Sequence, residues 1–198
     1  MTFTATQESN AETRSALNNN NGVDWQAGDE ISVFDGTGAG CNHQFSLTGD
    51  AREGRFSGAA SSEATSFTAV YPYTEGAQLE SDGIVSGITL PAEQTATPNS
   101  FDPKAALMMA YTTDKSKLDF KNAVSLVKVT TQFACKKIVL SANENIAGKG
   151  ELCYNDGEPS IDFNSNKSKT VTLKPASEDD VIAPGTYYIA ICPHESTG

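Results

Sequence analysis

The sequence predicts an all-β fold built from β-sandwich domains. Its apolar residues come in short runs separated by Gly, Asn, Asp, Ser and Thr, and few segments have helical composition. Turn signals recur about every ten residues, which is the spacing expected of short antiparallel strands. The segments between them are rich in Val, Ile, Phe, Tyr and Thr, the residues that suit a half-buried sheet. Together these observations indicate a sandwich architecture.

The predicted strands fall into two groups along the chain of 198 residues. The first group covers residues 2–6, 13–17, 30–34, 44–47, 54–57, 66–71, 83–90 and 106–112. The second group covers residues 117–120, 124–133, 136–142, 150–154, 159–163, 170–174 and 185–192. Between the groups lies a charged, glycine-free turn at residues 113–117. We therefore expect two β-sandwich domains, residues 1–115 and residues 116–198.

Local patterns support individual elements. Residues 136–141 alternate, with Ile138 and Leu140 on one face and Lys137, Val139 and Ser141 on the other, which predicts a strand buried on one face, as in an antiparallel sheet. Asp35-Gly36 and Asp156-Gly157 suit tight connections because both residue types tolerate left-handed backbone angles. Residues 103–110 fit either a short helix beginning at a proline or a strand. The glycine-rich residues 36–40 lack the Lys-Ser/Thr of a phosphate-binding loop, so we expect a hairpin tip.

Charge and hydropathy exclude two classes of partner. The chain has 14 basic and 25 acidic residues, a net charge of −11, which repels nucleic-acid backbones and anionic lipids. No apolar run reaches the roughly 18 residues that a transmembrane helix needs. The first residues also lack a basic-then-apolar leader pattern, so we expect that any export signal has been removed or never existed.

No metal, cofactor or enzyme site is predicted. The four cysteines have no zinc-knuckle or CxxC spacing; Cys135 and Cys192 are expected to be buried free thiols, with a disulfide as the alternative. His43, near Cys41, is part of a cluster with too few ligands for a metal. The Asn/Asp-rich residues 155–158 are better read as a solvated turn than as a calcium site. We expect no pocket in which titratable groups converge.

Four tyrosines offer a possible aromatic surface. Tyr71 and Tyr73 flank a proline, and Tyr187 and Tyr188 are adjacent in a predicted strand. In one interpretation these rings form a platform that stacks on sugars, which would make the chain a cell-surface glycan-binding β-sandwich module. In the other, alternate tyrosines pack inward as core residues.

Five segments, taken in order, resemble the fimbrillin-like family, whose members build type V pili or serve as their anchors and tips. The segments are residues 23–34 (VDWQAGDEISVF), 67–73 (FTAVYPY), 88–94 (ITLPAEQ), 118–129 (LDFKNAVSLVKV) and 184–191 (PGTYYIAI). They span nearly the whole chain. Their content is structural: Trp25 looks like a core anchor before the strand at residues 30–34, and Pro72 would end strand pairing.

The resemblance implies two transthyretin-like, Greek-key β-sandwich domains in a non-enzymatic structural subunit or accessory adhesin of a bacterial fimbrium. It implies export as a lipidated precursor to the outer membrane, so that the leader is the only membrane link. Its partners would be other pilus subunits, joined by donor-strand exchange, and ligands on host or bacterial surfaces. In this family a protease that cuts after Arg or Lys frees the first strand; Arg14 is the candidate, with an ordinary exposed arginine as the alternative.

The second domain is expected to lack its last strand. After residues 185–192 one more strand would complete the sandwich, but the chain ends a few residues later. Truncation and donation of that strand by another subunit are both open. In either case, function is expected at strand edges, where an incoming strand can supply hydrogen bonds and side-chain plugs.

Overall fold

The computed structural model describes residues 1–7, 25–81 and 83–193. These residues form sixteen β-strands and two single-turn 3-10 helices, η1 (Ala51–Glu53) and η2 (Pro103–Ala105). The predicted all-β class is therefore confirmed. The strand predicted at residues 13–17 and the processing candidate Arg14 lie outside the described residues.

Seven strands close into a barrel. In order around the barrel they are β1 (Thr2–Gln7), β10 (Lys117–Asn122), β9 (Met108–Thr112), β5 (Phe67–Tyr71), β2 (Glu30–Phe34), β3 (Asn42–Leu47) and β4 (Arg55–Gly58). Every neighbouring pair is antiparallel except β1 with β10, which run parallel. The interior is filled largely by aromatic rings, namely Phe3, Trp25, Phe45, Phe56, Phe67, Tyr71, Phe101 and Phe120.

Trp25 is the buried anchor that the sequence predicts. Its ring meets those of Phe56, Tyr71 and Phe120 edge to face, at centroid distances of 4.8, 5.4 and 5.7 Å. Its indole N–H donates to the carbonyl of Ala5 at 3.1 Å, so the polar atom of this buried ring is satisfied. This bond also ties the anchor to the first strand.

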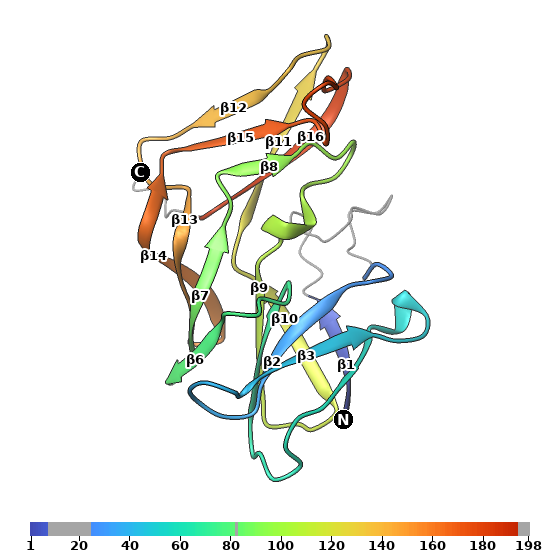
Figure 1. Ribbon diagram of the computed structural model, residues 1–198, viewed down its shortest axis with the longest axis vertical. Helices are drawn as coiled ribbons and strands as arrows, with labels where there is room; N and C mark the ends of the chain where they lie inside the picture. Colours follow the sequence, from blue (N-terminus) through green and yellow to red (C-terminus); the bar gives the residue numbers. More distant parts are fainter. Residues whose placement is uncertain (8–24, 82, 194–198) are drawn as a thin grey trace.

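Three smaller sheets complete the molecule (Figure 1). A four-stranded sheet has the order β14 (Glu158–Ser168), β13 (Ala147–Asn155), β7 (Ile84–Leu90) and β6 (Gln78–Ser81). A three-stranded sheet has the order β12 (Ile138–Ser141), β15 (Thr170–Lys174) and β8 (Glu93–Thr95). A two-stranded sheet joins β11 (Ser125–Thr131) to β16 (Gly185–Ile191).

Two further cores hold these sheets together. One lies between the outer face of the barrel and the four-stranded sheet, where Phe34 and Val70 pack with Val85 and Leu152. Strand β5 is consequently buried along its whole length, because barrel residues cover one face and the four-stranded sheet covers the other. The third core joins the two- and three-stranded sheets, which we call the C-terminal sheet pair, through Val171, Leu173, Tyr187 and Ile189.

Strand pairing crosses the predicted boundary between residues 115 and 116. Strand β10, assigned from sequence to the second group, pairs with β1 and β9 in the barrel. Strands β7 and β8 lie before the boundary but pair with β13 and β15. The chain therefore leaves the barrel after β5, builds β6–β8 against its C-terminal half, and returns for β9 and β10. The division into two domains stays a prediction.

Most local predictions are confirmed. Asp156 and Gly157 have φ angles of 51° and 86° and form the two-residue turn between β13 and β14. Residues 36–40 connect β2 to β3, as a hairpin tip. Residues 103–110 combine both alternatives, because Pro103 opens η2 and the chain then enters β9. Strands β6 and β8 were not predicted.

Candidate functional site: strand edges

Strand β1 closes the barrel and is the first candidate site. It pairs with β4 on one side and with β10 on the other. Phe3 and Ala5 point into the barrel core, where the ring of Phe3 lies 5.7 Å from that of Phe45 and 5.1 Å from that of Phe67. Removal of β1 would therefore open a slot lined by aromatic rings.

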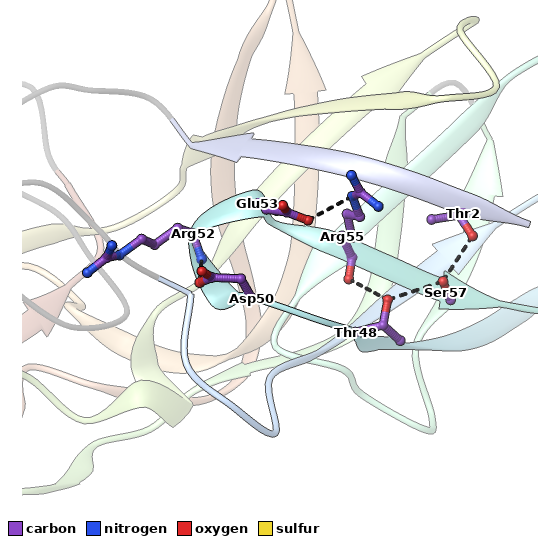
Figure 2. Close-up of polar contacts among 7 residues, drawn as sticks. All are labelled: Thr2, Thr48, Asp50, Arg52, Glu53, Arg55 and Ser57. Carbon is purple, nitrogen blue, oxygen red and sulfur yellow. Dashed lines mark hydrogen bonds and ion pairs between the residues drawn. The ribbon is translucent and has the colours of Figure 1, made fainter.

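Figure 2 shows the exposed polar contacts around β4, one of which, between Thr2 and Ser57, reaches the outward side of β1. The hydroxyls of Thr2 and Ser57 lie 2.9 Å apart, and Thr48 Oγ1 donates to the carbonyl of Arg55 at 3.2 Å. The Arg55 guanidinium pairs with Glu53 at 3.1 Å. Such exposed contacts contribute little net free energy. The two buried apolar side chains and the backbone pairs must hold the strand.

A second candidate is the open side of the C-terminal sheet pair. Among the described residues, β11 pairs only with β16, and β12 pairs only with β15. The outer edges of β11 and β12 thus have no strand neighbour in the part of the chain that the structure describes. The sequence led us to expect an open position in this half of the chain, but after Cys192 rather than at these two edges.

A groove of about 420 Å³, the β11–β12 groove, lies where these two strands are joined. Its lining residues are Val129, Thr130, Thr131, Gln132, Phe133, Cys135, Lys137 and Ile138. The side chain of Phe133 is 72% exposed, the largest value among the exposed large hydrophobic residues. Val129 and Ile138 are half-buried and pack against the third core. The groove therefore offers apolar surface beside unpaired backbone.

The loop between β11 and β12 is anchored, so the groove is already formed. Cys135 exchanges two backbone hydrogen bonds with Ile182, at 3.0 and 2.8 Å. Lys136 Nζ donates to the carbonyls of Asp179 and Asp180 at 3.2 and 3.0 Å. Thr131 Oγ1 donates to the carbonyl of Phe133 at 2.8 Å. An incoming strand would need little rearrangement of this loop.

The opposite edge of β16 is already covered. The buried amide of Gln94 donates to the carbonyl of Ala190 at 2.7 Å and accepts from its N–H at 3.0 Å, as a neighbouring strand would. The backbone N–H of Asn99 adds a bond to Thr186, and the carbonyl of Ser100 accepts from Tyr188. Sequence reasoning missed this role of Gln94, because residues 92–99 look like a connector with no core-forming pattern.

The structure does not gather the four tyrosines of the sugar-platform interpretation on one surface. Tyr71 and Tyr187 are each 2% exposed and lie in different cores. The Tyr71 hydroxyl donates to Asp29 at 3.0 Å, and that of Tyr187 donates to the carbonyl of Ala183 at 2.9 Å. Tyr73 and Tyr188 are half-buried. The alternative, inward packing, describes Tyr71 and Tyr187, whose buried rings have no free face for a ligand.

All four cysteines are free thiols. Cys153 and Cys192 are buried, whereas Cys135 and Cys41 are half-buried, so burial of Cys135 is less complete than expected. Burial, together with the nearby charge of Asp162, raises the pKa of Cys192 to about 11. The sequence alternative of a disulfide is not seen in this structure.

The described residues hold no group of three or more His, Cys, Asp or Glu that could bind a metal. Among them there is also no helix long and apolar enough to cross a membrane. A cavity of about 720 Å³ is, however, lined by two carboxylates, those of Asp35 and Glu63, together with Tyr111 and Tyr154. The expectation that titratable groups do not converge in any pocket is therefore wrong.

Comparison with solved structures shows a shared fold. The chain is similar to a provisionally assigned cell adhesion protein from Bacteroides uniformis, with 19% identity and a TM-score of 0.53 over 99% of this chain and 75% of that chain. A second provisionally assigned cell adhesion protein, from Bacteroides ovatus, has 16% identity and a TM-score of 0.47 over 96% and 77%. No protein-family model and no curated protein sequence matches the chain.

Proposed function

We propose that this chain is a structural subunit or accessory adhesin of a bacterial surface pilus, joined to its neighbours by donor-strand exchange. The observation that carries the proposal is the open side of the C-terminal sheet pair. There the edges of β11 and β12 have no neighbour among the described strands and flank an apolar groove. This combination is what an incoming strand requires, and the proposed role needs no catalytic group.

The physical basis is strand addition. The unpaired N–H and C=O groups of an edge strand can bind a further strand through backbone hydrogen bonds. Alternate side chains of that strand would enter the β11–β12 groove and cover Phe133, whose exposed ring is otherwise in water. The main-chain bonds would give affinity, and the fit of side chains in the groove would select the partner.

Strand β1 provides a second acceptor position under the same proposal. Cleavage after Arg14 would free residues 1–14, and β1 with them, from the covalent chain. Its departure would leave the slot between β4 and β10, where a donated strand would pack against Phe45 and Phe67 as Phe3 does. In such an exchange the donated strand takes the place of β1, and the barrel stays closed.

The similarity to the B. uniformis protein supports the proposal through the shared fold and through that protein's assignment to cell adhesion. Under the proposal, the barrel and the smaller sheets correspond to two transthyretin-like sandwich units. The subunit would be exported with a lipidated leader and act at the cell surface, in the outer membrane or in an extracellular fimbrium. Its partners would be further subunits.

The proposal is tested by measuring the Tm of the purified chain with a synthetic strand peptide, either residues 2–17 or the terminal strand of a neighbouring subunit. A peptide that binds only the folded state stabilises it by about 2.7 kcal/mol at a hundred times its Kd, which raises the Tm by several degrees. A peptide of the same length with proline at alternate positions is the control, because it cannot form a ladder of backbone hydrogen bonds.

The variant Phe133→Ala locates the binding. It removes an exposed ring and should leave the fold intact, but it should reduce the Tm increase given by the peptide. If the peptide raises the Tm of this variant as much as that of the parent chain, the peptide binds outside the β11–β12 groove. If neither strand peptide raises the Tm, the proposed assembly mechanism is wrong.

A further inference from the structure

The cavity that contains Asp35 and Glu63 lies between the barrel and the four-stranded sheet. It has a volume of about 720 Å³, within the roughly 300–1,000 Å³ of small-molecule sites, and is formed by residues of both layers. It shares no lining residue with the β11–β12 groove. We call it the Tyr111 cavity. Its function is thus separable from strand exchange.

One wall of the Tyr111 cavity is aromatic. Tyr111 projects from β9 and is 48% exposed, and Tyr154 comes from β13. Their ring centroids are 6.5 Å apart and their planes are inclined at 36°. Phe34 and Leu79, both buried, add apolar surface to the lining. A half-exposed ring in a cavity presents a face on which an apolar ligand face can stack.

The other lining groups are hydroxyls and carboxylates. Thr37, Ser66 and Thr68 contribute hydroxyls, and Asp35 and Glu63 contribute the charges. Asp35 Oδ2 accepts from the N–H of Ser61 at 2.6 Å and lies 2.9 Å from His43 Nε2. Desolvation is the largest single effect on this carboxyl and opposes ionisation, but the hydrogen bonds and His43 together lower its pKa. Asp35 is therefore an anion at neutral pH.

The described lining residues include no lysine or arginine. With two carboxylates and no cationic side chain, the cavity disfavours phosphate, carboxylate or sulfate groups on a ligand. It offers acceptors for ligand hydroxyls and an aromatic face for a ligand C–H surface. These are the features that a pyranose ring carries, with hydroxyls at its rim and C–H groups on its faces.

The walls are fixed by contacts outside the cavity. The hairpin tip at residues 36–40 is tied to β6 by a bond from the N–H of Gly38 to the carbonyl of Leu79, at 2.9 Å. Asn42 Nδ2 donates to the carbonyls of Thr74 and Ala77 at 2.8 and 3.2 Å. Lys115 Nζ donates to the carbonyl of Ser62, next to Glu63, at 2.5 Å. The cavity is preformed, which lowers the entropic cost of binding.

We propose that the Tyr111 cavity binds an oligosaccharide that carries no acidic group. One sugar ring stacks on Tyr111, and its hydroxyls donate to Asp35 and Glu63. The chain would then recognise a surface glycan through a site built by the packing of two layers. This differs from the four-tyrosine platform, which the burial of Tyr71 and Tyr187 does not allow.

The test begins with a glycan array of neutral, amino and acidic glycans, followed by calorimetric titration with the tightest-binding member. We expect binding to neutral or amino glycans and none to their sialylated or sulfated counterparts. Tyr111→Ala should weaken binding about tenfold or more, since it removes the stacking face. The matched control is Phe133→Ala, which removes another exposed ring and should leave the Kd unchanged.

A second pair of variants tests whether the ligand occupies the Tyr111 cavity. Thr37→Trp places a large side chain at an exposed lining position and should abolish binding, whereas Ala39→Trp, in the same loop but outside the lining, should not. The proposal is overturned if no neutral or amino glycan binds, if acidic glycans bind best, or if Tyr111→Ala and Thr37→Trp bind as well as the parent chain. The variant Tyr111→Ala should still bind the strand peptide. Loss of glycan binding and loss of strand binding can therefore be told apart, and each result tests one proposal.

Discussion

At the scale of single residues, the buried Tyr71 and the half-buried Asp29 make the stability of the barrel depend on pH. Burial is the largest cause that raises the pKa of Tyr71 far above its usual value of 10, and the charge and hydrogen bond of Asp29 add to it. The same burial raises the pKa of Asp29. Above pH 10 the unfolded chain loses the Tyr71 proton while the folded chain keeps it, so this group makes stability fall as pH rises.

The variant Tyr71→Phe measures this effect. At pH 8 the variant should be less stable by about 1–2 kcal/mol, because the half-buried Asp29 carboxyl loses its donor at 3.0 Å. Above pH 10 the parent chain should lose up to about 1.4 kcal/mol per pH unit more than the variant. Urea unfolding at pH 8 and pH 11 gives both numbers. A constant difference between the two chains across this range would contradict the argument.

The cysteines give a second prediction at this scale. Cys153 and Cys192 are buried, and burial raises the pKa of both thiols. Because the thiolate is the reactive form, iodoacetamide at pH 8 should leave these two unmodified in the folded chain and should label all four after unfolding. Mass spectrometry of the digested protein identifies the labelled sites. Labelling of Cys192 before the half-buried Cys41 would show that the second core opens.

Residue roles were predictable from the sequence only where the local pattern decides them. Trp25 was predicted as an anchor because tryptophan is on average highly buried and this one precedes an alternating strand. The burial of Tyr71 and the exposure of Tyr111 were not predictable, since both tyrosines lie in strands and only the closure of the barrel decides which of them points into its core. The Tyr111 cavity is formed by layers that are distant in sequence, and no motif marks it.

At the scale of elements, β1 should be replaceable by a peptide. A chain without residues 1–7 loses the burial of Phe3, which alone is expected to be worth about 3–5 kcal/mol, and its Tm should fall steeply. Adding a peptide of residues 1–7 should restore much of the loss, because the slot between β4 and β10 accepts the same strand.

The control for this experiment is a peptide with Phe3→Ala, which keeps the backbone pairs but lacks the ring that packs on Phe45 and Phe67. It should restore far less stability. A peptide with Thr4→Ala, changed at an exposed position of the same strand, should act as the parent does. Equal rescue by all three peptides would mean that side-chain packing does not select the strand in this slot.

Elements were predictable to the extent that they carry apolar residues. Strands such as β2 and β15 coincide with their predicted ranges, since alternating Val, Ile and Leu side chains set their limits. Strands β6 and β8 are short and mostly polar, so periodicity gives no signal for them. The parallel pairing of β1 with β10 joins the first and the last barrel strands in the sequence. Local sequence patterns carry no information about pairs so far apart.

At the scale of the whole molecule, the all-β class followed from composition, but the arrangement of the sheets did not. Turn residues mark where strands end, not which strands pair. A linear boundary assumes that each group of strands forms its own sheets. Here β6–β8 leave the barrel to pair with the C-terminal half, and β10 returns to it, so the outer face of the barrel becomes part of a shared core. Only long-range packing decides this.

This arrangement predicts that the chain folds as one cooperative unit. Residues 1–115 and 116–198, produced separately, should each remain largely unfolded: the first fragment lacks β10, which closes the barrel beside β1, and the second lacks β7 and β8. Mixed together, the fragments should recover strand signal in circular dichroism, and the intact chain should unfold in a single transition. If the fragment of residues 1–115 folds alone with a dispersed amide spectrum, the shared core is not needed for stability, and the boundary near residue 115 is a true domain boundary.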